Sequence, residues 1–98
     1  MPMPRQNITV TQSMTTMGPG IYGVVTAGIT LTLENWAFWP EADAAVIVKD
    51  LTGAGSPNIT VNVAGGGTID GSASIVMNTP SESLSFKPYQ FGTSWILV

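Results

Sequence analysis

The chain has 98 residues, the length of one domain, and 44% of them are hydrophobic, which is enough for a core. Only 9% are charged and the net charge is −3, so its three basic residues predict neither nucleic-acid binding nor a polybasic membrane contact. The absence of cysteine and histidine excludes disulfides, zinc sites built from those residues, and imidazole catalysis. We expect no cofactor.

The N-terminal segment, residues 1–20, is predicted to form an extended arm ahead of a single β domain, residues 21–98. No apolar run follows the two early prolines, so neither a signal peptide nor a membrane span is expected. Within the arm, residues 7–12 alternate polar and apolar side chains, which is typical of a half-buried strand. Gly18-Pro19-Gly20 predicts a turn.

Two further segments alternate in the same way and provide the predicted core. In residues 28–34 every second side chain is apolar, and residues 58–63 repeat the pattern. The apolar side chains that we expect to be buried there are Ile29, Leu31, Leu33, Ile59, Val61 and Val63. The remaining predicted strands span residues 21–26, 45–50, 68–71, 73–77, 82–87 and 93–98.

The breakers between these strands decide the predicted fold class. The chain has 11 glycines and 7 prolines, too many for long helices, and no segment keeps a helical period. Asp70-Gly71 is a strong hairpin signal. The sequence therefore predicts an all-β fold: a compact small β-sandwich or barrel-like module of short antiparallel strands with an extended N-terminal arm.

No motif in the chain supports catalysis. Residues 18–23 match the letters G-x-G-x-x-G, but the dinucleotide-binding motif needs a following helix, and a strand-like segment follows here. Glu41, Asp43 and Asp50 could offer carboxylates to a calcium ion, but their spacing fits no EF-hand loop. We favour solvation for Glu41 and Asp43, and an exposed strand end for Asp50. We predict that the chain is not an enzyme and binds no metal.

Three aromatic side chains are the candidate contact with a partner. On a strand, Trp36 and Phe38 share one face and Trp39 points to the other. Trp39 could then stack on a sugar or on a partner protein. The alternative, which we favour, is that all three aromatic residues serve the core or a subunit interface.

The composition also favours self-association. A surface with few charges tends to associate with itself or with partners. Segments 21–26, 44–48 and 95–98 are apolar on both faces, and strands buried on both faces need cover from two sides. Because neighbouring copies can supply that cover, we predict a homo-oligomer. The apolar C-terminal residues predict a packed terminal strand.

An ordered series of motifs resembles modules of known viral proteins. Lys49-Asp50-Leu51-Thr52-Gly53, Asn58-Ile59-Thr60-Val61 and Gly66-Gly67-Thr68-Ile69-Asp70-Gly71 are followed by Trp95. In this order they resemble small β-rich modules of tailed-bacteriophage virion proteins, of the capsid decoration, head-fibre and tail-fibre types, over residues 21–98. The resemblance implies an architectural role for these loops and no catalytic residue.

The resemblance implies a structural virion protein, made in the host cytoplasm. Fibres usually carry such a module within a longer chain that has a shaft, whereas here it follows a short arm. We therefore expect a capsid decoration, cement or head-fibre protein whose partner is the major capsid protein or another virion protein. Such modules are often trimers, so we favour a trimer over a dimer. The alternative is a receptor- or carbohydrate-binding module of a tail fibre.

Overall fold

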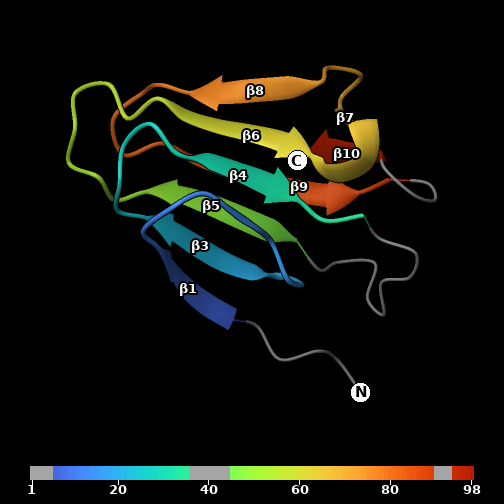
Figure 1. The fold of residues 1–98 in the computed structure, drawn as a ribbon, viewed down its shortest axis with the longest axis horizontal. Helices are drawn as coiled ribbons and strands as arrows, with labels where there is room; N and C mark the ends of the chain where they lie inside the picture. Colours follow the sequence, from blue (N-terminus) through green and yellow to red (C-terminus); the bar gives the residue numbers. More distant parts are fainter. Residues whose placement is uncertain (1–5, 36–44, 90–93) are drawn as a thin grey trace.

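The computed structural model describes residues 6–35, 45–89 and 94–98, whose strands form a six-stranded and a four-stranded sheet (Figure 1). The order of the first is β1-β3-β5-β9-β10-β7, and that of the second is β2-β4-β6-β8. The described elements are β1 (Gln6–Val10), β2 (Met14–Thr15), β3 (Gly20–Val24), β4 (Thr30–Leu33), β5 (Val46–Asp50), β6 (Ile59–Val63), the short 3-10 turn η1 (Ala64–Gly66), β7 (Thr68–Ile69), β8 (Ser74–Met77), β9 (Ser83–Pro88) and β10 (Ser94–Leu97). Because the described residues contain no α-helix, they agree with the predicted all-β class.

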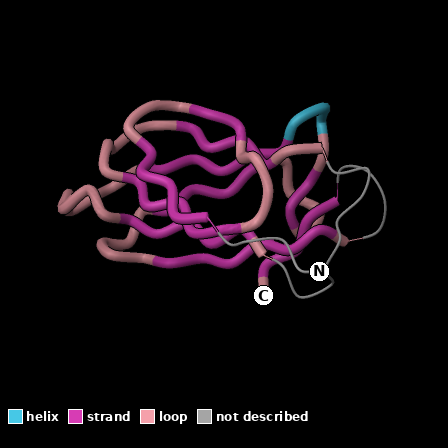
Figure 2. The backbone as a smooth tube through the Cα atoms, turned by 90° about the horizontal axis from the view of Figure 1, so that it is seen from below, coloured by secondary structure: helices cyan, strands magenta, loops and turns pink. Residues whose placement is uncertain are grey.

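The chain alternates between the two sheets from β1 to β9. Figure 2 shows it crossing from one layer to the other through loops at both ends of the strands. Between two neighbouring strands of one sheet the chain therefore passes to the other sheet and back. The two neighbours consequently run in the same direction. This holds for β1, β3 and β5, and for β2, β4 and β6. In Figure 1 the arrows of β3 and β5 point one way and those of β4 and β6 the other.

The prediction of antiparallel strands is therefore wrong for much of the fold. Both sheets are mixed: β8 is antiparallel to β6, β9 is antiparallel to β5 and β10, and β7 pairs with β10 in parallel. The physical reason is that side-chain alternation is the same in both arrangements, so it reveals a strand but not the direction of its partner.

One hydrophobic core joins the inner faces of both sheets. All six side chains predicted from the alternating segments are in it, and none is more than 7% exposed. The six-stranded sheet adds its largest members, among them Tyr22, Phe86 and Trp95. The core prediction is confirmed, and the C-terminal strand is packed into it.

The expected N-terminal arm contributes two strands within its described residues. β1 pairs along its whole length with β3, and Val10 is buried in the core. Gly20 allows this approach, because a Cβ at that position would lie 2.5 Å from the backbone oxygen of Gln6. Residues 6–20 therefore belong to the sheets rather than to an arm ahead of them.

The tight turn predicted at Asp70-Gly71 is present, closed by an isolated antiparallel bridge, but it joins strands of different sheets and not the two strands of a hairpin. Ile69 and Ser72 exchange two backbone hydrogen bonds of 2.8 and 2.9 Å around the two-residue loop. Asp70 and Gly71 have φ values of 50° and 84°, as a type I′ turn requires. The loop reverses the chain between β7 and β8.

Candidate interaction surface

The aromatic residues predicted to contact a partner, Trp36, Phe38 and Trp39, lie outside the described residues. The same is true of Glu41 and Asp43 in the suggested calcium group. The surface analysed below is formed by other residues, on the strands of the six-stranded sheet.

The outer face of the six-stranded sheet carries an apolar row. We call the "outer row" the side chains of Ile21, Ile47, Ile96 and Val98. Ile21 and Ile47 are register partners on β3 and β5, and Val98 donates a 3.0 Å backbone hydrogen bond to Ser85, the register partner of Ile47. Ile21 is 43% exposed and Val98 is 65% exposed, while Ile47 and Ile96 are half-buried. The row agrees with the prediction that these strands are apolar on both faces.

Two lysines border the outer row. Lys49 follows Ile47 on the same face of β5, and Lys87 on β9 is the register partner of Ile96. The ammonium group of Lys49 donates a hydrogen bond to the backbone oxygen of Ser81. No described strand residue on this face is acidic, so its charged side chains are all positive in a chain whose net charge is negative, and they lie among the outer row and the polar side chains of Asn7, Thr9, Ser83 and Ser85.

The opposite surface, on the four-stranded sheet, has a different chemistry. Its outward side chains on the described strands are uncharged and nearly all polar: Thr15, Thr30, Thr32, Thr60, Asn62, Ser74 and Val76. This is the wet face that alternation predicts for a two-layer fold. The contrast between the two sheets makes the outer row the stronger candidate for a contact with a partner.

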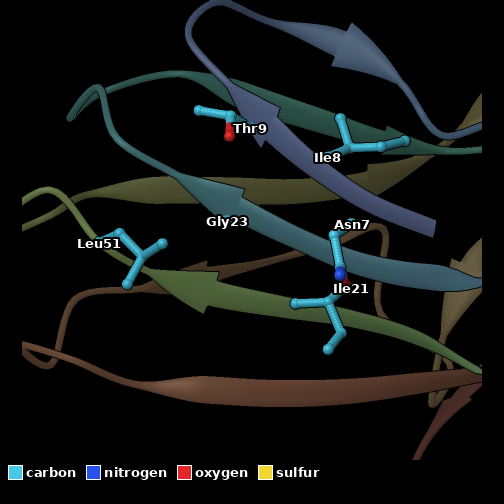
Figure 3. A pocket seen from close by; sticks show the side chains of 6 residues that line it. All are labelled: Asn7, Ile8, Thr9, Ile21, Gly23 and Leu51. Carbon is cyan, nitrogen blue, oxygen red and sulfur yellow. The ribbon is translucent and has the colours of Figure 1, made fainter.

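A small groove opens beside the outer row, over β1 and β3. Its volume is about 170 Å³, and it is lined by Asn7, Ile8, Thr9, Ile21, Gly23 and Leu51. Figure 3 shows the side chains around the bare backbone of Gly23. A Cβ at Gly23 would lie 2.7 Å from Cδ1 of Leu51, so glycine lets the 56% exposed Leu51 lean over the strand. An isolated glycine in an apolar strand was the available sequence signal, because it often marks close approach.

A buried polar cluster anchors the loop before β3. The hydroxyl of Tyr22 accepts a 3.0 Å hydrogen bond from the N–H of Met17 and donates one of 2.8 Å to the oxygen of Gly18. Glu34 accepts bonds from the hydroxyl of Thr16 and from the N–H of Gly18, at 3.1 and 2.6 Å. Burial raises the pKa of Tyr22, and the Glu34 carboxylate adds to this, although the bond from Met17 acts in the opposite direction. These hydrogen bonds form a structural clamp: they hold the loop of residues 16–18 against Tyr22 on β3 and against Glu34 after β4.

Replacing Tyr22 with phenylalanine is expected to lower the free energy of unfolding by about 1–3 kcal/mol, because the buried oxygen of Gly18 and the part-buried N–H of Met17 lose their partner. Urea denaturation followed by circular dichroism measures the change. A Tyr89→Phe variant is the control, since Tyr89 is 52% exposed. An equal effect of both substitutions would contradict the clamp.

Asp50 is not at an exposed strand end, so that prediction is wrong. Only 2% of its surface is exposed, and its carboxylate accepts hydrogen bonds of 2.8 and 2.9 Å from the N–H groups of Thr52 and Ser81. Burial raises the pKa of Asp50, but the bonds from Thr52 and Ser81 and the charge of Lys49 outweigh it, so the net pKa lies below its ordinary value. The carboxylate is used to join two loops.

The remaining sequence motifs are placed as follows. Gly18 to Gly23 leads into β3, and no helix follows it, so its surroundings differ from those of a dinucleotide-binding turn. Ser85 and Lys87 share a face of β9. Within residues 6–35, 45–89 and 94–98, no three acidic side chains gather as metal ligands would, and no helix is long and apolar enough to cross a membrane.

Comparison with known proteins adds no family assignment: no protein-family model matches the chain, and no curated protein matches it.

Proposed function

We propose that the chain is a non-catalytic structural protein of a tailed-bacteriophage virion, of the capsid decoration, cement or head-fibre kind. In this proposal it is a small β-sandwich that binds the capsid as an oligomer through the outer face of the six-stranded sheet. The motif series ending at Trp95 supports the viral class. The observation that carries the docking surface is the outer row, which places four apolar side chains on the outer face of the six-stranded sheet, whereas Val76 is the one apolar side chain that the described strands of the four-stranded sheet turn outward.

The chemistry of this face indicates what it would bind. Contiguous exposed apolar side chains mark interaction sites on soluble domains. Lys49 and Lys87 at the border favour a partner with acidic or carbonyl groups around an apolar centre. The capsid partner is therefore proposed to present a shallow apolar patch with an acidic rim.

Docking is tested with an outer-row variant that combines Ile21→Thr and Val98→Thr. The matched control is Val76→Thr, which changes a 54% exposed valine on the four-stranded sheet. The measurement is co-sedimentation with capsids of the bacteriophage whose genome encodes the chain. We expect the outer-row variant to bind at least about tenfold more weakly, because about 1.4 kcal/mol of lost apolar burial is a tenfold change in affinity.

Two results would contradict this proposal. One is wild-type protein that does not co-sediment with capsids, and the other is equal binding by the outer-row variant and the control. A glycan array tests the carbohydrate-binding alternative, for which a decoration protein should give no signal. Light scattering on a size-exclusion column tests the oligomer, with a trimer as the favoured state and a monodisperse monomer at micromolar concentration as the contrary result.

A further inference from the structure

β1 is an edge strand of the six-stranded sheet, and among the described residues no strand pairs with the outer side of its backbone (Figure 1). The oxygen of Val10 accepts a 3.0 Å hydrogen bond from the N–H of Val25, on the β3 side. Alternate residues of an edge strand turn their N–H and C=O groups to opposite sides. Gln6, Ile8 and Val10 therefore face β3, and the backbone groups of Asn7 and Thr9 face outward.

This edge lacks the devices that usually prevent strand pairing. Natural edge strands are kept apart by charges, prolines, bulges or very short length. β1 has five residues, Gln6–Val10, with no charge and no proline, and its register with β3 is unbroken by a bulge. The other edge of the same sheet, β7, has only two residues.

We propose that β1 pairs in antiparallel register with β1 of a second copy, across a two-fold axis through Ile8. In this register Asn7 of each copy lies opposite Thr9 of the other. Each such pair exchanges two backbone hydrogen bonds, so four bonds form and every outward group of Asn7 and Thr9 is used. The two six-stranded sheets become one continuous sheet.

A second copy fits this edge better than a different partner, because the edge is complementary to itself. The two Ile8 side chains meet as a non-hydrogen-bonded pair, in which cross-strand packing is closest. None of the six residues that line the neighbouring groove is charged, so two copies meet there without like-charge repulsion despite the net charge of −3. The uncharged groove surface of one copy would therefore continue into that of the other across the two-fold axis.

This inference rests on the self-association within the proposed function and makes it more specific. A two-fold contact joins copies in even numbers, so it implies a dimer, or two trimers joined back to back, in place of an isolated trimer. It does not depend on the capsid or on the outer row.

Cysteine cross-linking tests the register directly, because the chain has no cysteine of its own. Residues in a non-hydrogen-bonded antiparallel pair have Cα atoms about 4.5 Å apart, within the range for a disulfide. We expect Ile8→Cys to give a disulfide-linked dimer on mild oxidation. The control is Thr15→Cys, at an exposed position on the edge strand β2, which should stay uncross-linked.

A proline at position 9 tests the backbone bonds. Thr9→Pro removes an outward N–H and leaves the ladder with β3 intact, whereas Thr15→Pro removes an outward N–H from β2. The N–H of Thr16 donates to the oxygen of Thr32, which places that of Thr15 outward. Light scattering should show the assembly halved by Thr9→Pro and unchanged by Thr15→Pro, with circular dichroism confirming that both fold. If Thr9→Pro does not fold, the cross-linking result decides.

The outcomes separate this inference from the proposed function. An oligomer that Thr9→Pro leaves unchanged, together with Ile8→Cys that fails to cross-link, would overturn the β1 pairing and leave capsid docking standing. If Ile8→Cys forms a cross-linked dimer and the wild-type protein does not co-sediment with capsids, the β1 pairing would be supported and the virion role rejected.

Discussion

Replacing Trp95 with alanine is expected to lower the free energy of unfolding by about 3–5 kcal/mol, the range for truncating a buried aromatic side chain. Trp95 is 1% exposed on β10, and its Nε1–H donates a 3.3 Å hydrogen bond to the backbone oxygen of Glu34. The substitution removes packing between the sheets and leaves that oxygen without its donor. Since natural domains have about 5–15 kcal/mol of stability, this loss would remove a large share of the free energy of unfolding.

Urea denaturation followed by far-ultraviolet circular dichroism measures this loss. Trp95→Phe is the matched control, because it keeps an aromatic ring and most of the side-chain volume while it removes the N–H donor and the second ring. Trp95→Phe should lower the free energy of unfolding by less than half as much as Trp95→Ala does. If the free energy of unfolding of Trp95→Ala lay within about 1 kcal/mol of the wild-type value, β10 would not be part of the core.

Replacing Asp50 with alanine is expected to lower the free energy of unfolding by about 2–4 kcal/mol at pH 7. Both of its carboxylate oxygens accept part-buried backbone hydrogen bonds, from Thr52 and from Ser81, and a hydrogen bond to a charged group contributes about 1.5–3 kcal/mol. The two bonds connect the loop after β5 to the turn before β9, so the loss would loosen the β5–β9 pair. Urea denaturation of the purified variant measures this change in the free energy of unfolding.

The same carboxylate predicts a pH dependence of defined sign. Its folded pKa lies below the unfolded value of about 3.9, so its contribution is complete above that value and is lost as the pH falls through the folded pKa. The stability difference between wild type and Asp50→Asn should therefore be largest near pH 7 and shrink toward pH 2. A difference that stays constant over this range would mean that the charge of Asp50 contributes nothing.

The alternation of side chains was enough to locate nearly all strands and the core. Leu31 and Leu33 on β4, and Val61 on β6, are buried as the period of two requires, because that period depends only on local backbone geometry. The Asp70-Gly71 turn was equally local, since its positive φ values suit those residues. β2 was missed because a strand of two residues has no period to detect.

The candidate surface was less accessible to sequence reasoning. The outer row was anticipated as strands apolar on both faces, but the groove under Leu51 was not, because Leu51 belongs to a loop after β5 and Gly23 to another strand. Asp50 was placed in solvent because its partner Ser81 lies 31 residues away. Such contacts become visible only when distant segments are brought together.

The sequence by itself determined the strand-rich class, the buried side chains and the surplus of apolar positions in segments 21–26, 44–48 and 95–98, since these follow from residue type and local period. Only the tertiary structure decided that the chain crosses between sheets after almost every strand, which makes β1, β3 and β5 parallel. It also decided that β1 forms an edge of the six-stranded sheet, with the backbone groups of Asn7 and Thr9 outward. Strand direction and edge position depend on long-range pairing, whose free energy is set by the contacts of the whole fold and not by any one segment.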